Sequence, residues 1–197
     1  MSQAAEREAL RHLVPPPDEA AAPIDWHRMA TSWGREFPPD YRHFVDVYGA
    51  GSIQGYLVIQ QPEYKDAEPA SPYGGMLLET RNAEHSWAQE NKSPELAHTH
   101  PVLITWGVTA GSDLLCWDAS RTDPATWPLL VRNRDDNLWR RHDCGMVAFL
   151  VRLLRRDFAE CPLGDTALWG RPSSLFLREA EQKRLWAQGV NPWEGKR

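Results

Sequence analysis

The chain has 197 residues, of which 42% are hydrophobic and 25% charged, proportions typical of a folded globular protein. A chain of this length forms one or two domains and can build a hydrophobic core without disulfides or metal. The composition excludes wholesale disorder. The longest apolar run, residues 146–151, is far too short for a membrane span.

Charge is unevenly distributed along the chain. Residues 1–98 carry eight basic and fifteen acidic side chains, whereas residues 99–197 carry fourteen basic and twelve acidic ones. The acidic first half argues against nucleic-acid binding, because a phosphate backbone requires a basic surface. It could attract a basic protein partner over long range, although solubility alone explains it equally well.

Cysteine usage and the start of the chain indicate where the protein resides. The three cysteines (Cys116, Cys144 and Cys161) form no CxxC pair, and no basic stretch followed by an apolar one opens the sequence. These features are typical of a reducing compartment. We therefore expect a soluble, cytoplasmic protein that does not act at a membrane.

The first half of the chain is predicted to be mainly helical, because apolar residues recur there at a spacing of three and four. Asp25 is placed to cap one helix, and Gly34 to end it. In chain order we predict helices over 2–14, 26–33 and 39–48, a strand over 52–60, an exposed loop over 62–75, and a helix over 76–91.

The second half changes to a strand-like period. We predict hairpins from strands 102–108 and 114–117 and from strands 127–134 and 138–141, followed by helices over 145–158 and 174–188. Consecutive hairpins give an antiparallel sheet. The predicted fold class is therefore α+β, with an antiparallel-rich sheet of about five or six strands and N-terminal and C-terminal helices packed on it.

Tryptophan is abundant, with ten residues in the chain. Four lie on or beside predicted strands, and we expect at least two of these in the core, while exposed ones would suit a protein interface. The four are Trp106, Trp117, Trp127 and Trp139. Three more, Trp169, Trp186 and Trp193, are expected to hold the C-terminal tail against the body.

Two patterns superficially suggest ligand sites. The glycines Gly49, Gly51 and Gly55 follow a predicted helix and precede a strand, the reverse of the order that a dinucleotide-binding loop requires. We interpret Gly49 as a helix end and Gly51 as a turn residue. His98 and His100 could share one face of an extended segment, but the spacing brings no third or fourth metal ligand to them.

No catalytic constellation stands out. The sequence lacks a G-x-S-x-G nucleophile elbow, and Cys116 is flanked by Leu115 and Trp117, which indicates a buried structural thiol. The paired carboxylates Asp135 and Asp136 lie at a solvated hairpin tip, where burial cannot raise a pKa. We expect no catalytic residues, no metal and no cofactor.

Two motifs resemble a known family. The segment FPPDYRHFVDVYGAGSI, residues 37–53, resembles the helix-to-strand entry motif of the SUKH superfamily (SMI/KNR-like). The segment LITWGVTAGSDLLCW, residues 103–117, is similar to its W-G-x-T-x-x-G-D hairpin, with Ser112 inserted before Asp113. The likeness covers roughly residues 24–160. It divides the chain into a helix and proline-rich linker (1–23), a SUKH-like α+β domain (24–162) and a C-terminal helical extension packed on it (163–197).

The resemblance implies a non-enzymatic domain that binds a protein, since the superfamily includes bacterial immunity proteins that neutralise polymorphic toxins, often nucleases. An acidic surface would compete with phosphate for the basic groove of such a toxin. The predicted partner-binding residues are acidic or aromatic and belong to the loop and the helix after it: Glu63, Tyr64, Asp66, Glu68, Glu79 and Glu84. Two alternatives remain: a regulator that binds an endogenous, non-toxic protein, and a small-molecule enzyme that uses Cys116 or His98 and His100.

Overall fold

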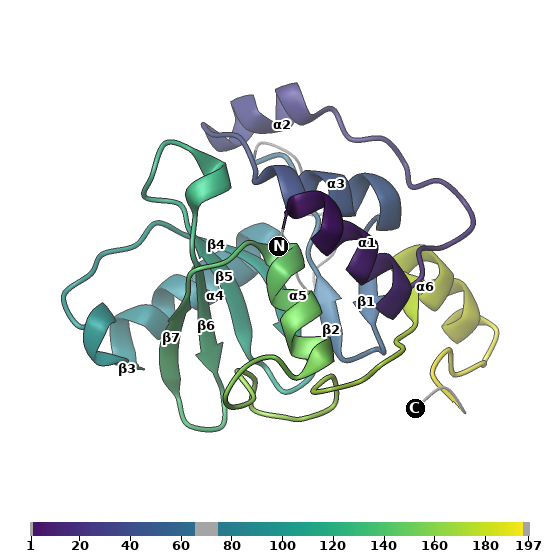
Figure 1. The fold of residues 1–197 in the computed structure, drawn as a ribbon. Helices are drawn as coiled ribbons and strands as arrows, with labels where there is room; N and C mark the ends of the chain where they lie inside the picture. The colour runs from purple at the N-terminus through teal and green to yellow at the C-terminus, as the bar shows by residue number, and fades with distance from the viewer. Residues whose placement is uncertain (1, 66–74, 195–197) are drawn as a thin grey trace.

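A mixed sheet runs through the molecule and carries helices on both faces (Figure 1). This computed structural model describes residues 2–65 and 75–194. Within these residues the strand order is β3-β7-β6-β5-β4-β2-β1-β8, and every neighbouring pair is antiparallel except β3 and β7. The predicted α+β class with a largely antiparallel sheet is confirmed, and the sheet has eight strands, more than predicted.

The element bounds are as follows. The helices are α1 (Gln3–Leu13), α2 (Trp26–Trp33), α3 (Pro39–Tyr48), α4 (Met76–Gln89), α5 (Met146–Arg155) and α6 (Glu179–Ala187), with short 3-10 turns η1 (Pro94–Leu96) and η2 (Pro124–Thr126). The strands are β1 (Gly51–Ile53), β2 (Leu57–Ile59), β3 (Asn91–Lys92), β4 (Leu103–Thr109), β5 (Leu114–Asp118), β6 (Leu129–Asn133), β7 (Leu138–His142) and β8 (Phe176–Arg178).

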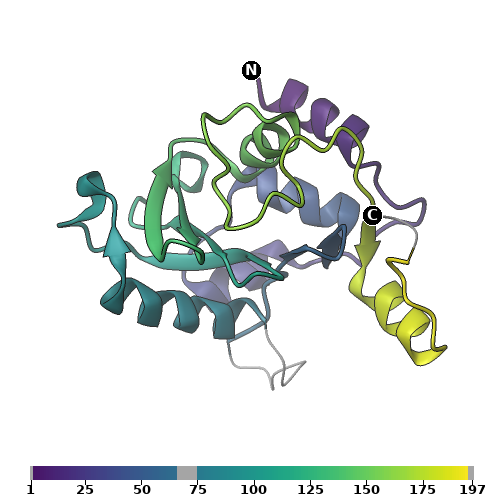
Figure 2. The ribbon, with the colours of Figure 1, turned by 90° about the horizontal axis from the view of Figure 1, so that it is seen from below.

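The two faces of the sheet bury two separate cores, as the alternation along β5 shows. Leu115 and Trp117 enter the core shared with α1, α3 and α5, whereas Leu114 and Cys116 enter a smaller core beneath α4. Figure 2 shows α4 on one side of the sheet and α1 and α5 on the other. All four tryptophans expected near strands are buried, with Trp127 the most exposed of them at 4%.

Helices α2 and α3 begin or end where local sequence signals place them, whereas α5 ends at Arg155, before the predicted end at 158. The Asp25 side chain accepts a hydrogen bond from the Arg28 amide at 2.9 Å and caps α2. Gly34 ends α2 in the left-handed conformation, with φ of 71°, and Gly49 ends α3 with φ of 76°. Arg156 ends α5, also with a left-handed φ, of 63°.

The predicted strand over 52–60 is wrong in one respect, because it is a hairpin. Gln54 and Gly55 both adopt positive φ, of 55° and 63°, and the Tyr56 amide donates to the Ile53 carbonyl oxygen (3.0 Å), so a tight turn over residues 54–56 separates β1 from β2. Gly51 is not a turn residue but the first residue of β1. A Cβ atom there would lie 2.3 Å from the Leu177 carbonyl oxygen, so glycine lets β8 approach β1.

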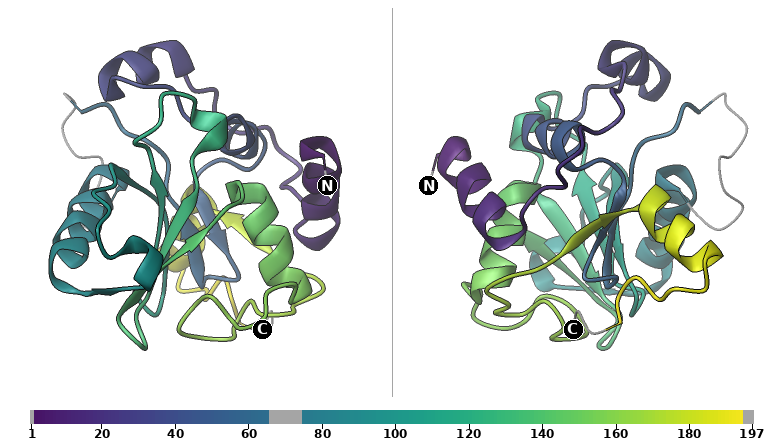
Figure 3. Two further views of the ribbon diagram at one scale, coloured as in Figure 1. Left: turned by 60° about the vertical axis from the view of Figure 1, so that its left-hand side comes forward. Right: turned by 90° about the vertical axis from the view of Figure 1, so that its right-hand side faces the viewer.

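The C-terminal segment also differs from prediction. The expected helix over 174–188 begins as strand β8, which pairs with β1 and forms one edge of the sheet, and only then continues as α6. Figure 3 shows α6 projecting beyond this edge. Trp193 packs on Gly55 and Trp169 is partly buried, but Trp186 is 55% exposed and therefore does not hold the tail to the body.

Arg178 joins the two ends of the chain. Its guanidinium donates to the carbonyl oxygens of Tyr48 (2.8 Å) and Val47 (3.2 Å) at the end of α3. It also donates to those of Glu19 (2.6 Å) and Ala20 (3.3 Å) in the proline-rich linker. A cation at this position satisfies carbonyls that the end of a helix leaves unpaired.

Asp113, the acidic residue of the hairpin motif, is almost completely buried. Its carboxylate accepts hydrogen bonds from the Thr109 hydroxyl (2.8 Å), the Arg134 amide (2.8 Å) and the Gly164 amide (3.2 Å). These bonds connect the β4–β5 turn to the end of β6 and to the loop after α5. Within the described residues, no helix is both long and apolar enough to cross a bilayer.

Candidate functional site

The predicted acidic surface is described in part, because Asp66 and Glu68 lie outside the described residues. Glu63 is committed to the fold: its carboxylate accepts hydrogen bonds from the amides of Met76 (3.0 Å) and Leu77 (3.1 Å) and so caps α4. The helix dipole and these two donors neutralise much of its charge.

Tyr64 is held against α2. The Arg28 guanidinium lies over its ring at 4.3 Å, and the next residue, Lys65, donates its amide to the Ser32 hydroxyl at 2.9 Å. The positive charges of Arg28 and Lys65 offset the acidity expected here. This part of the predicted surface is therefore mixed in charge.

Glu79 and Glu84 both lie on α4 but point to different sides. Five residues on a helix correspond to about 140° of rotation about its axis. Glu79 accepts a hydrogen bond from the Asn82 amide group at 3.0 Å, whereas Glu84 is exposed. The structure thus places Glu63 at the start of α4, Tyr64 against α2, and Glu79 and Glu84 on different sides of α4.

Among the groups weighed as reactive, the Cys116 thiol is buried and the two histidines are exposed. Burial raises the pKa of Cys116 to about 12 and that of Cys144 to about 11, so both are neutral thiols at physiological pH. His98 and His100 are exposed. The described residues contain no group of three or more histidine, cysteine or acidic side chains that could hold a metal.

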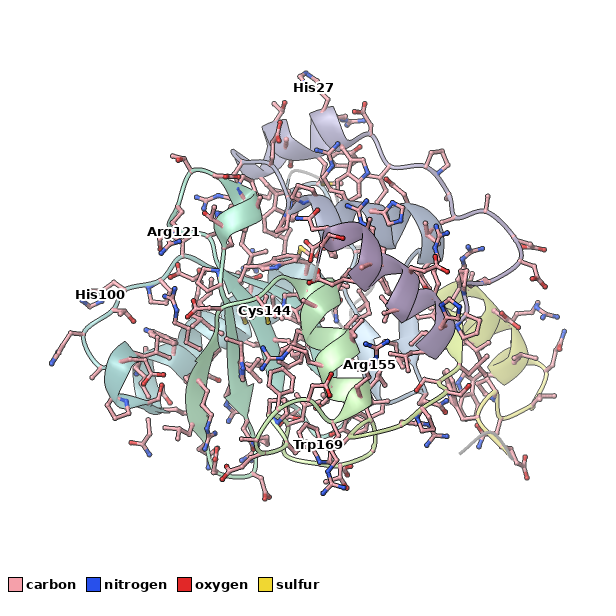
Figure 4. All side chains as sticks on the ribbon, in the orientation of Figure 1. His27, His100, Arg121, Cys144, Arg155 and Trp169 are labelled. Atoms are coloured by element: carbon pink, nitrogen blue, oxygen red, sulfur yellow. The ribbon has the colours of Figure 1, made fainter. Side chains whose placement is uncertain are left out.

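A different acidic site lies at the N-terminal end of α5. A cleft of about 250 Å³ opens there between the start of α1, the start of α3, η2 and the β7–α5 connection. Cys144, labelled in Figure 4, marks its position in front of the sheet. Three carboxylates line the cleft, from Glu6, Asp40 and Asp143, and none of its described lining residues is basic.

Asp40 forms the floor of this acidic cleft and positions α5. It is 7% exposed and accepts hydrogen bonds from its neighbour Tyr41 (2.9 Å) and from the Val147 amide (3.1 Å) in the first turn of α5. Gly145 allows this approach, because a Cβ atom there would lie 2.6 Å from the carboxylate. Asp40 therefore caps the helix from a position 107 residues away.

Glu6 and Asp143 supply the accessible charge of the acidic cleft. Glu6 is half-buried; burial raises its pKa, and the nearby charge of Asp40 raises it further. Within the described residues, the Glu6 carboxylate has neither an ion pair nor a hydrogen bond. Asp143 is exposed and pairs with Arg141 at 2.7 Å.

Two tryptophans provide the apolar walls. Trp117 and Trp127 are both buried, with ring centroids 6.4 Å apart, and each contributes to the lining. The Trp127 indole donates to the Arg121 carbonyl oxygen at 2.7 Å, which fixes that ring. Carboxylates beside indole rings form a setting that suits a cationic group.

Sequence reasoning missed the acidic cleft, because its carboxylates are at positions 6, 40 and 143. The proline-aspartate pair at 39–40 marked a helix start, but nothing in the sequence shows that Asp40 also caps α5. The exposed Trp186 on α6 was also missed as a surface residue. Comparisons with protein-family models, curated proteins and solved structures give no match for this chain.

Proposed function

We propose that this chain is a non-enzymatic, SUKH-like protein-binding domain that neutralises a polymorphic toxin, such as a nuclease, by covering its basic active-site groove. The resemblance of residues 37–53 and 103–117 to the SUKH motifs supports this proposal. In the structure these motif residues have structural roles: Tyr41, Phe44 and Tyr48 are buried, and Asp113 is fully bonded. They specify the fold and leave the surface free to be adapted to a partner.

The observation that carries the proposal is the acidic cleft at the N-terminal end of α5. It presents the half-buried carboxylate of Glu6 and the exposed one of Asp143, and two largely buried indole rings contribute to its lining. A basic side chain from a partner could neutralise these charges and cover the apolar walls. Charged groups at the rim of a contact are typical of protein interfaces.

A regulator that binds an endogenous, non-toxic protein is the second candidate function. Such a regulator would use the same cleft and would differ from a toxin-neutralising protein only in the partner that it binds. We would recover the partner by affinity purification from the native host and express it alone. A partner that arrests growth alone, and is harmless when co-expressed with this chain, supports the toxin-neutralising function; a harmless partner supports the regulator.

The contribution of the cleft is tested with two charge-matched variants. E6Q/D143N removes two charges at the cleft, and E79Q/E84Q removes two charges from α4 on the opposite face of the sheet. Both keep the shape of the side chains. We expect the cleft variant to weaken partner binding by about tenfold or more, which corresponds to about 1.4 kcal/mol, and to reduce its salt dependence.

The α4 variant should bind the partner as the unchanged protein does. If instead E79Q/E84Q loses binding and E6Q/D143N retains it, the partner uses the surface predicted from the sequence and not the cleft. If neither variant alters affinity or salt dependence, the proposed role of acidic residues in recognition is wrong. Thermal unfolding of each variant shows whether a loss of binding reflects a loss of fold.

A further inference from the structure

Helices α1 and α5 form one face with a consistent direction, on which most residues of α1 are at least partly exposed, whereas seven of the ten residues of α5 are buried. They pack side by side and run parallel, because the start of α1 lies at the cleft with the start of α5, while both C-terminal ends meet the segment that leads to β8. There the Ser174 amide donates to the Leu13 carbonyl oxygen (2.7 Å) and the Gly170 amide to that of Leu153 (3.1 Å). We call this surface the α1/α5 face.

The two ends of the α1/α5 face carry opposite charge. The acidic end is the cleft, with Glu6, Asp40 and Asp143. The basic end contains three exposed arginines: Arg11, Arg155 and Arg156. In Figure 4, Cys144 marks the acidic end, and Arg155 and Trp169 mark the basic end on the same side of the molecule.

The arginines of the basic end lack carboxylate partners. None of the three forms a salt bridge with any described residue. One of them is held over an aromatic ring: the Arg156 guanidinium lies 5.9 Å from the centroid of the Trp169 ring. The helix dipole favours basic residues at this end, but that effect leaves their guanidinium groups free to bind a carboxylate.

We propose that two copies of this chain associate through their α1/α5 faces, related by a two-fold axis that sets the helices of the two copies antiparallel. In this arrangement the arginines at the basic end of each copy face the carboxylates at the acidic end of the other, so opposite charges meet at both ends of the interface. The helix α5 has ten residues and is about 15 Å long, so its two ends fit within one interface of ordinary size.

The two-fold arrangement follows from the charges. A parallel pair would place arginine against arginine and carboxylate against carboxylate, which is unfavourable. A head-to-tail contact would satisfy one acidic end and leave the other open in an unclosed chain. Only the antiparallel pair is self-complementary. This inference does not rest on the proposed toxin partner, but both would cover the same acidic cleft, so the partner and the second copy would compete for it.

The test uses the full chain and two charge-reversed variants. R11E/R155E makes the basic end acidic at two exposed positions, and E6K/D143K makes the acidic end basic. We would measure mass by sedimentation equilibrium over a range of protein and salt concentrations. We expect the unchanged chain to form dimers that dissociate as salt rises, and each variant alone to dimerise at least about tenfold more weakly.

Mixing the two variants is the decisive experiment. In a two-fold interface, the new glutamates of one variant face the new lysines of the other, and its native carboxylates face native arginines. An equimolar mixture should therefore form heterodimers, although neither variant dimerises well alone. Failure of the mixture to associate overturns the proposed geometry, and an unchanged chain that stays monomeric at low salt overturns the association itself.

Circular dichroism and thermal unfolding establish that both variants are folded. If either variant is not folded, hydrogen exchange of the unchanged chain at low and high protein concentration gives an independent test of the interface. Protection that increases with concentration in residues 3–13 and 146–155 supports the interface. Protection that increases only elsewhere, for instance around the exposed Trp186, contradicts it.

Discussion

Replacing Asp113 with alanine should destabilise the protein more than most single substitutions. The change removes the acceptor for three hydrogen bonds, from the Thr109 hydroxyl and from the amides of Arg134 and Gly164. The buried hydroxyl should cost about 1.5 kcal/mol and each half-buried amide about 1 kcal/mol, or about 3.5 kcal/mol together. For a chain of this length, that corresponds to a fall in melting temperature of about 10 °C.

The asparagine variant separates the hydrogen bonds from the charge. D113N keeps one oxygen, which can still accept from Arg134 and Gly164, and loses only the acceptor for Thr109. We therefore expect a loss of about 1 kcal/mol for D113N. Asp135 is exposed near the same network, and D135A removes an equal charge there, so it should change stability by no more than about 0.5 kcal/mol.

Urea unfolding followed by tryptophan fluorescence measures all three variants. If D113A is as stable as D135A, the hydrogen-bond network does not support the fold and the motif aspartate has another role. If D113N loses as much as D113A, the negative charge itself is the stabilising feature, and the reasoning from individual hydrogen bonds is wrong.

Three further predictions concern a buried histidine, the anchor of the C-terminal segment and the thiols. Burial, with Arg152 and Arg140 nearby, lowers the pKa of His142 to about 4. The free energy of unfolding should therefore be highest above the unfolded pKa of about 6.5 and fall by up to about 3 kcal/mol as the pH drops towards 4. H142L should flatten this part of the stability–pH curve, and an unchanged slope in H142L would contradict the prediction. R178A should lower the free energy of unfolding in urea by about 2 kcal/mol and make the linker over residues 15–23 easier to cleave with protease. R178K should restore less than half of that loss, because lysine cannot reach four carbonyl oxygens at once. Equal stability of R178K and the unchanged chain would refute this prediction. The raised pKa values of Cys116 and Cys144 predict that both thiols react with a disulfide reagent at pH 8 at least about two orders of magnitude more slowly than free cysteine. A rapidly reacting Cys116 would contradict this prediction and support the enzyme alternative.

The sequence by itself determined the elements whose signals are local. The spacing of Tyr41, Phe44 and Tyr48 defines α3, and Asp25 and Gly34 define the ends of α2, because helix periodicity and capping act within one or two turns. The β4–β5 and β6–β7 hairpins were predictable for the same reason. Each pairs strands that are neighbours in the chain, joined by turn residues with a clear preference.

Tertiary structure decided the features that join distant residues. Strand β8 pairs with β1 across more than 120 residues, and Glu63 and Asp40 cap helices to which they are not adjacent. From the sequence, a carboxylate that caps a distant helix cannot be distinguished from one at the surface. The predicted acidic surface therefore included Glu63, and Asp40 was interpreted only as part of a helix start. The acidic cleft exists because packing brings residues 6, 40 and 143 together, and no local pattern encodes that proximity.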